Sequence, residues 1–311
     1  MTRSASLLSV TAASIDFQNP LVLAAGTAAY GREIAGVMDL EALGGIVTKA
    51  VSPEPRKGAP APRVAEFDGG MMNAVGLANP GLEMVLRDDI PWLAQNVKRP
   101  RVIVNVVGSA VDDFVAVTTA FADVDAVHAL ELNVSCPNTT AGGTEFGADN
   151  DTLRSLVSRC REATTKPLFV KLSPMLPNIA DTARVAVDAG ADALTLVNTI
   201  PGLAIDVESR RPALGFGTGG ISGGGLLPVG VLAVWKVSRA VKVPLVGVGG
   251  ITKGTDVVQY LLAGASLVGL GTAALRDPKS PARIIGELSN WCESHGVKSV
   301  SEIVGRLGWP S

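Results

Sequence analysis

The chain has 311 residues, of which 47% are hydrophobic and 18% are charged, so it is neither a disordered chain nor a coiled coil. Its 27 basic and 29 acidic residues nearly balance and form no long run of one sign, which argues against a nucleic-acid-binding face and a basic membrane patch. The three cysteines lie far apart without a CxxC pair, so they predict neither a disulfide framework nor an iron–sulfur cluster in this chain.

The apolar runs give no sign of secretion or of a membrane span. The first ten residues contain too short an apolar run for a signal peptide, and no uncharged run of about 18 apolar residues follows. We therefore expect a protein of the reducing cytoplasm that contacts neither membrane nor nucleic acid. We also expect one domain over residues 1–311.

Eight short apolar runs divide the chain into regular units. They are continuous rather than alternating, which is typical of strands buried on both faces of a parallel sheet. The runs are residues 21–25, 45–49, 102–106, 129–133, 168–172, 193–197, 245–248 and 267–270. Helices are expected between several of them, at residues 149–163, 179–189, 229–240, 255–263 and 281–294. This α/β alternation predicts a closed (β/α)8 TIM barrel, with an open doubly wound sheet as the alternative. Residues 14–17 are expected to form one arm of an N-terminal hairpin.

Three connections after predicted strands are much longer than usual: residues 50–80, 134–148 and 198–228. In a barrel such loops gather at the C-terminal face, where active sites lie. Within the third connection, residues 215–220 match the pattern GxGxxG, but no strand precedes them and no helix follows. We therefore predict a flexible loop there rather than a dinucleotide site.

Polar residues close most of the predicted strands. They include Lys49, Asn105, Asn133, Lys171 and Asn198. Any one of them alone could cap a neighbouring helix or loop. Because burying a Lys or Asn is costly unless a partner satisfies it, all five together indicate a ligand rich in carbonyl, imide and carboxylate groups. Glycine clusters at residues 247–251 and 269–272 follow the last two strands, where such barrels commonly bind phosphate on backbone N–H groups and a helix N-terminus.

Cys136 lies in the glycine-containing loop after the fourth predicted strand. A thiol on a hinged loop at the barrel mouth can act as a base or nucleophile. His128 precedes that strand and His295 lies near the C-terminus, so we expect neither a Cys–His pair nor a metal site. We predict that Cys136 is a lone general base. Buried structural thiols are expected at Cys160 and Cys292.

Three segments of the chain resemble the catalytic chain of class 1 dihydroorotate dehydrogenases, specifically the B-type. They are residues 48–56 (TKAVSPEPR), 73–81 (NAVGLANPG) and 131–138 (ELNVSCPN), the last followed by Gly-Gly and Phe-Gly at residues 142–147. The resemblance extends over nearly the whole chain. Its glycine-containing patterns look like the B-type rather than the fumarate-reducing A-type, and the Ser base of the membrane-bound class 2 is not part of the pattern.

The resemblance implies a flavin mononucleotide (FMN) at the barrel mouth, with its phosphate on Gly249, Gly250, Gly271 and Thr272. It implies further flavin contacts at Ala25, Lys49, Ala50, Asn105, Asn133, Lys171, Val197 and Gly223. It implies dihydroorotate contacts at Lys49, Asn73, Ala74, Val75, Gly76, Leu77, Asn133, Asn198 and Thr199. Asn side chains offer a donor and an acceptor to a cyclic imide, and Lys49 supplies a cation for the substrate carboxylate. Lys171 would stabilise negative charge on the reduced flavin.

The implied reaction is oxidation of (S)-dihydroorotate to orotate in pyrimidine biosynthesis. Cys136 would remove the C5 proton while hydride passes from C6 to flavin N5. The B-type resemblance, together with the lack of a dinucleotide site and of cluster ligands in this chain, implies a partner subunit with FAD and a 2Fe–2S cluster that passes the electrons to NAD. The expected assembly is a homodimer or a heterotetramer. Ala25, Ala59 and the pair Gly224-Gly225 depart from the family's usual Ser, Asn and Pro-Ala, which affects loop rigidity and some flavin contacts.

Three other interpretations compete with this one. A related dihydropyrimidine dehydrogenase subunit would act on uracil or thymine, which lack the carboxylate that Lys49 would bind. A Schiff-base aldolase would use Lys171, because a Lys at a barrel strand end is typical of that class. A non-catalytic scaffold is disfavoured by the full set of polar residues at the mouth.

Overall fold

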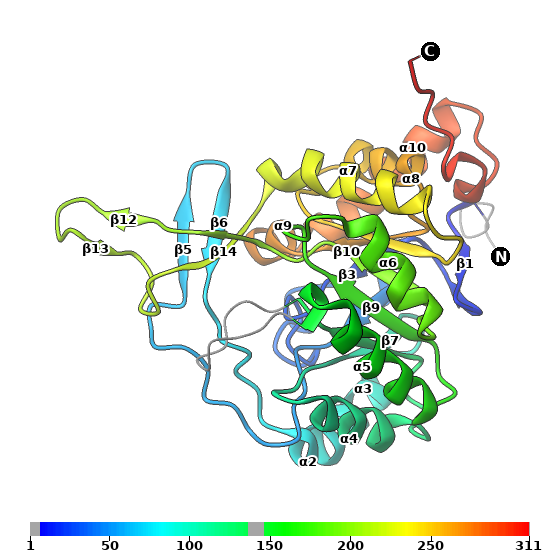
Figure 1. The fold of residues 1–311 in the computed structure, drawn as a ribbon. Coiled ribbons are helices and arrows are strands. Elements are labelled where there is room, and N and C mark those ends of the chain that lie inside the picture. The colour runs from blue at the N-terminus through cyan, green and yellow to red at the C-terminus, as the bar shows by residue number, and fades with distance from the viewer. Residues whose placement is uncertain (1–6, 136–145, 311) are drawn as a thin grey trace.

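The chain folds into a closed parallel barrel. A computed structural model describes residues 7–135 and 146–310 (Figure 1). The barrel strands, in spatial order, are β3 (Leu21–Leu23), β4 (Gly45–Val47), β7 (Arg101–Val106), β8 (Ala129–Asn133), β9 (Leu168–Leu172), β10 (Ala193–Leu196), β15 (Leu245–Val248) and β16 (Leu267–Leu270). β16 pairs with β3 and closes the ring. All eight strands overlap the predicted apolar runs, so the (β/α)8 barrel is confirmed and the open sheet is wrong.

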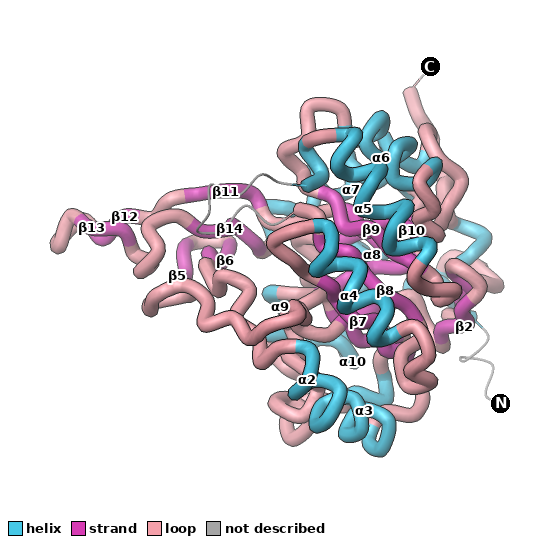
Figure 2. Tube along the Cα trace, turned by 60° about the horizontal axis from the view of Figure 1, so that its bottom comes forward, coloured by secondary structure: helices cyan, strands magenta, loops and turns pink. Residues whose placement is uncertain are grey.

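Helices surround the barrel (Figure 2). They are α2 (Leu82–Met84), α3 (Ile90–Asn96), α4 (Val111–Phe121), α5 (Asn150–Glu162), α6 (Ile179–Asp188), α7 (Leu227–Ser238), α8 (Gly254–Ala263), α9 (Thr272–Arg276) and α10 (Ser280–Ser294). Short 3₁₀ turns lie at Leu40–Ala42, Phe146–Ala148, Gly224–Leu226 and Val300–Ile303, and a π-helical turn at Val85–Asp89 joins α2 to α3. α5 and α6 begin where predicted because Asp149 and Asn178 cap their first turns. α8 ends where Gly264 adopts a left-handed conformation. Within the described residues, no helix combines the length and apolarity needed to cross a bilayer.

A short antiparallel hairpin fills the N-terminal end of the barrel, as predicted. It consists of β1 (Val10–Ala12) and β2 (Ile15–Phe17). Ile15 and Phe17 pack in one buried cluster with inward-facing barrel residues, among them Ile103 and Phe169. Because apolar side chains fill this end of the barrel, a ligand must enter from the opposite, C-terminal end.

A second sheet projects from the C-terminal end of the barrel, opposite β1 (Figure 1). Its strands come from the first and third long connections and lie in the order β11 (Ile200–Gly202), β14 (Gly219–Ser222), β6 (Gly70–Asn73) and β5 (Val64–Phe67). A ribbon of β12 (Ile205–Asp206) and β13 (Arg211–Pro212) extends it. We call this sheet and ribbon the arm.

The prediction of a flexible loop at residues 215–220 is wrong for the second half of this segment. Gly219 and Gly220 belong to β14, which pairs with both β11 and β6. A Cβ on Gly220 would lie 2.0 Å from Thr199 Oγ1, so glycine permits a close approach of the two strands. The strand depends on pairing between distant segments, which local composition does not reveal.

Candidate active site

A cavity of about 390 Å³ lies at the C-terminal end of the barrel, between the strand ends and the base of the arm. Its volume is in the range of small-molecule sites. Its walls come from the segments that follow β3, β4, β10, β15 and β16 and from arm residues such as Met71 and Asn73. A second hollow, beside the N-terminal ends of β15 and β16, contains none of the predicted site residues.

The cavity brings the predicted site residues together. Those that line it are Ala25, Lys49, Ala50, Asn73, Val75, Gly76, Leu77, Asn105, Asn133, Lys171, Val197, Asn198, Thr199, Gly223, Gly249, Gly250, Gly271 and Thr272. Ala74 does not line it, because its side chain is fully buried in the apolar cluster of the arm that also contains Met72 and Leu214. Cys136 lies outside the described residues.

The floor of the cavity is polar, although it is built on barrel strands. Lys171 on β9 is only 6% exposed and Asn105 on β7 only 1%. Among the described residues, no group accepts a hydrogen bond or forms an ion pair with the Lys171 ammonium, and none pairs with Asn105 Oδ1. Buried polar groups are normally hydrogen-bonded, so these two side chains indicate a ligand with complementary groups.

Asn198 anchors the start of the loop that contains Cys136. Its Nδ2 donates to the backbone oxygen of Ser135 at 3.0 Å and to Ser135 Oγ at 2.9 Å. Ser135 Oγ in turn donates to Asn133 Oδ1 at 3.1 Å. The residue immediately before Cys136 is therefore fixed to two side chains that line the cavity.

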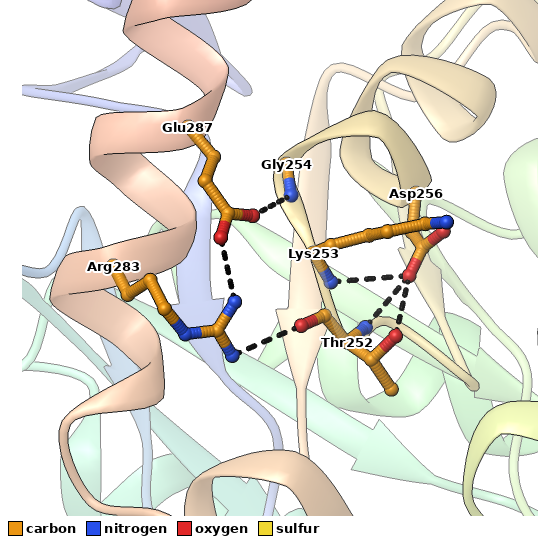
Figure 3. Close-up of polar contacts among 6 residues, drawn as sticks. All are labelled: Thr252, Lys253, Gly254, Asp256, Arg283 and Glu287. Atoms are coloured by element: carbon orange, nitrogen blue, oxygen red, sulfur yellow. Dashed lines mark hydrogen bonds and ion pairs between the residues drawn. The ribbon is translucent and has the colours of Figure 1, made fainter.

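Two carboxylates hold the segment between β15 and α8 (Figure 3). Asp256 accepts hydrogen bonds from the backbone N and the Oγ1 of Thr252, at 2.8 and 2.9 Å. Glu287 on α10 accepts from Gly254 N at 2.7 Å and from Arg283. Arg283 also donates to the Thr252 carbonyl. These bonds occupy the backbone amides of Thr252 and Gly254, so an anion in the cavity cannot use them.

Four other amides remain available for an anion. Within the described part of the chain, no hydrogen-bond acceptor pairs with the backbone N–H of Gly250 or Ile251, nor with those of Thr272 and Ala273 at the start of α9. All four residues line the cavity. Gly250 has φ +76°, and a Cβ there would lie 2.2 Å from Leu227 N, so only glycine fits. Amides grouped in this way form a phosphate-binding cradle.

Tyr260 on α8 fixes the carbonyl side of this cradle. Its side chain is fully buried, and its hydroxyl donates to the Gly249 carbonyl at 2.7 Å. Burial raises the pKa of the Tyr260 hydroxyl, so it stays protonated as a donor. Sequence patterns gave no indication of this role.

Replacing Tyr260 by Phe should weaken binding of a phosphate-bearing ligand about fivefold, because one hydrogen bond is worth about 1 kcal/mol. The measurement is fluorescence titration of the apoprotein with FMN. Ser238→Ala is the matched control, since Ser238 Oγ bonds the Ala263 carbonyl outside the cavity. It should lower stability and leave the affinity unchanged. Equal affinities of the Tyr260 variant and the parent would contradict the assigned role.

The arm is joined to the phosphate cradle through Thr272, which was predicted, and through Ser222 and Arg276, which were not. Thr272 Oγ1 donates to Ser222 Oγ at 2.8 Å, and Ser222 Oγ donates to the Met71 carbonyl at 3.2 Å. Arg276 lines the cavity and lies 3.5 Å from Glu66 on β5. Arg276 lies at the end of α9, six residues after the last strand, so its position gave no signal in the sequence.

The remaining candidates lie away from the cavity. His128 accepts from Val102 N through Nδ1, and His295 stacks on Trp291. Cys160 and Cys292 are buried free thiols, as predicted. Within residues 7–135 and 146–310, no group of three or more His, Cys, Asp or Glu side chains could hold a metal ion.

Comparison with known proteins gives one consistent family. A family model described as dihydroorotate dehydrogenase matches residues 7–291. The chain is 46% identical over 300 residues to a protein of Pelobacter propionicus named dihydroorotate dehydrogenase B (NAD(+)), catalytic subunit, which covers 96% of this chain and 98% of that one. A protein of the same name from Bacillus pumilus is 44% identical, with 96% of each chain covered. The solved structure of the Eimeria tenella enzyme in complex with ferulenol superposes with a TM-score of 0.82 at 25% identity, covering 96% of this chain and 88% of that one.

Proposed function

Because this chain belongs to the dihydroorotate dehydrogenase family, we propose that it oxidises (S)-dihydroorotate to orotate as the catalytic subunit of a B-type enzyme. One observation carries the proposal: every residue expected to contact the flavin lines the same cavity. The family assignment also removes the Schiff-base aldolase and the scaffold from consideration. We propose one FMN-binding domain over residues 1–311 that works in the cytoplasm.

The described residues fit FMN in two independent ways. The amides of Gly250, Ile251, Thr272 and Ala273 suit a phosphate dianion. At the floor of the cavity, Asn105 Oδ1 has no partner among residues 7–135 and 146–310, as expected where a polar ring system makes the missing bond. When bound, FMN supplies a two-electron acceptor for the hydride of the substrate.

Each polar side chain has a distinct part in the proposed reaction. Lys49, half-buried at the cavity wall, binds the substrate carboxylate. The amide of Asn73 and the Oδ1 of Asn198, whose Nδ2 is bonded to Ser135, hold the pyrimidine ring. Cys136 takes the C5 proton as general base. Val75, Gly76 and Leu77 line the cavity and close it over the substrate from the arm side.

The two electrons that the flavin accepts must then pass from this chain to another acceptor. The name "catalytic subunit" carried by the relatives supports a separate partner subunit. We propose that this partner carries FAD and a 2Fe–2S cluster and passes the electrons to NAD, in a heterotetramer built on a homodimer of this chain.

Anaerobic reduction tests the proposal directly. The purified chain, reconstituted with FMN, should lose its visible flavin absorption when dihydroorotate is added and should keep it with dihydrouracil. Reoxidation by NAD should require the partner subunit, while fumarate should fail and an artificial dye should succeed without it. A chain that retains no FMN, or that is reduced by dihydrouracil alone, would overturn the proposal.

The rate of flavin reduction should fall toward acidic pH. An unperturbed cysteine thiol has a pKa of about 8.5, so the thiolate fraction of Cys136 falls about tenfold for each pH unit well below that value. Stopped-flow reduction at saturating dihydroorotate between pH 6 and pH 9 measures the profile. A flat profile over this range would exclude Cys136 as the base.

A further inference from the structure

Glu131 is a buried carboxylate in the interior of the barrel. It lies in the middle of β8, is 2% exposed, and does not line the cavity. Two positions nearer the N-terminal end of the same strand, Ala129 belongs to the apolar cluster that the hairpin closes. Two positions further, Asn133 reaches the cavity. Glu131 therefore lies in a layer between the apolar plug and the polar floor of the site.

Both carboxylate oxygens of Glu131 are engaged by side chains from other strands. Asn105 Nδ2 on β7 donates to Oε1 at 2.7 Å. Thr195 Oγ1 on β10 donates to Oε2 at 2.6 Å. Charge-assisted hydrogen bonds of this length are stronger than neutral ones, so the carboxylate holds both donors firmly.

The contact determines the direction of the Asn105 amide. A carboxylate only accepts hydrogen bonds, so the NH₂ group of Asn105 must face Glu131. The reversed amide would bring two oxygens together at 2.7 Å. With Nδ2 on Glu131, Oδ1 is left buried and without a partner within the described residues. Asn105 lines the cavity and keeps Oδ1 as an unpaired acceptor, while one N–H of its NH₂ group is already bonded to Glu131.

We propose that Glu131 is a positioning residue that holds Asn105 as a hydrogen-bond acceptor for the N3–H group of bound FMN. The inference rests on the proposed function and extends it to a residue that does not line the cavity. The oxidised isoalloxazine ring has several acceptors but a single N–H donor, at N3. A fixed acceptor on the barrel floor thus selects the ring's pyrimidine edge and orients the ring relative to the substrate.

Proton exchange at N3 tests this assignment in the intact protein. The chain is reconstituted with ¹⁵N-labelled FMN, and the exchange of the N3 proton with water is followed by NMR. In the parent protein the exchange should be at least about tenfold slower than in free FMN, because the proton is bonded to Asn105 Oδ1. In Glu131→Gln, whose amide can pair with Asn105 in either direction, the protection should be lost. Fluorescence titration should show about tenfold weaker FMN binding.

Thr195→Val is the matched control. It removes the donor to the other carboxylate oxygen and keeps the contact between Glu131 and Asn105, so the N3 proton should stay protected. Exchange in the parent as fast as in free FMN, or unchanged protection in Glu131→Gln, would overturn the inference. The exchange rate measured in the parent protein tests the inference even if Glu131→Gln does not fold. FMN that binds without N3 protection would refute the role of Glu131 alone, whereas failure to bind FMN would refute the proposed function.

Discussion

Replacing Cys136 by alanine should slow reduction of the bound flavin by dihydroorotate about 10²–10⁴-fold, because a positioned general base contributes that much to proton abstraction. FMN should stay bound, since the cavity residues that we assign to it do not include Cys136. Cys136→Ser should retain part of the rate, because the hydroxyl is a weaker base in the same place. Stopped-flow absorbance of the flavin under anaerobic conditions measures the rate of reduction in the parent, in Cys136→Ala and in Cys136→Ser.

The geometry next to Cys136 supports this expectation. Ser135 is 1% exposed and is bonded to Asn198, so the chain leaves the barrel at a fixed point on the cavity wall. Cys160→Ala is the control: that thiol is buried in α5, and its loss should affect stability rather than the rate. If Cys136→Ala reduced flavin as fast as this control, another group would have to be the base.

The barrel was predictable because its strands obey a simple physical rule. Strands such as β3 and β16 are buried along their whole length, so their sequences are continuous apolar runs. The arm strands are different: β5 is largely exposed, and β14 contains two glycines. Their pairing arises where two long connections meet, and no local pattern encodes it.

The site was predictable to the extent that it lies at strand ends. Lys171 and Asn105 stand out because polar side chains interrupt apolar runs, and the barrel then brings them to one cavity. The role of Glu131 was not accessible in this way. Asn105 is its register partner on the neighbouring strand β7, and Thr195 lies on β10, with β9 between that strand and β8. Such contacts depend on the stagger of the strands rather than on spacing along the chain.

Lys171 places a positive charge in a nearly dry environment. Its side chain is 6% exposed, it lines the cavity, and no described carboxylate forms an ion pair with it. At about 4 Å and an effective dielectric constant of about 20, a unit charge stabilises an opposite charge by about 4 kcal/mol. For a two-electron couple, about 1.4 kcal/mol corresponds to about 30 mV. The ammonium can therefore raise the potential of a flavin that becomes anionic on reduction by as much as about 90 mV.

Replacing Lys171 by Met should accordingly lower the midpoint potential of bound FMN by about 50–90 mV. The rate of reduction by dihydroorotate should fall by about 10²-fold or more. Met keeps the approximate length of the side chain and removes its charge, so FMN should still bind. Spectroelectrochemical titration measures the potential independently of turnover. Lys49→Met provides the contrast: loss of the carboxylate partner should raise the KM for dihydroorotate, and because Lys49 is only half-buried the potential should shift less than in Lys171→Met. If the midpoint potential of bound FMN were unaltered in Lys171→Met, the Lys171 ammonium would not stabilise the reduced flavin.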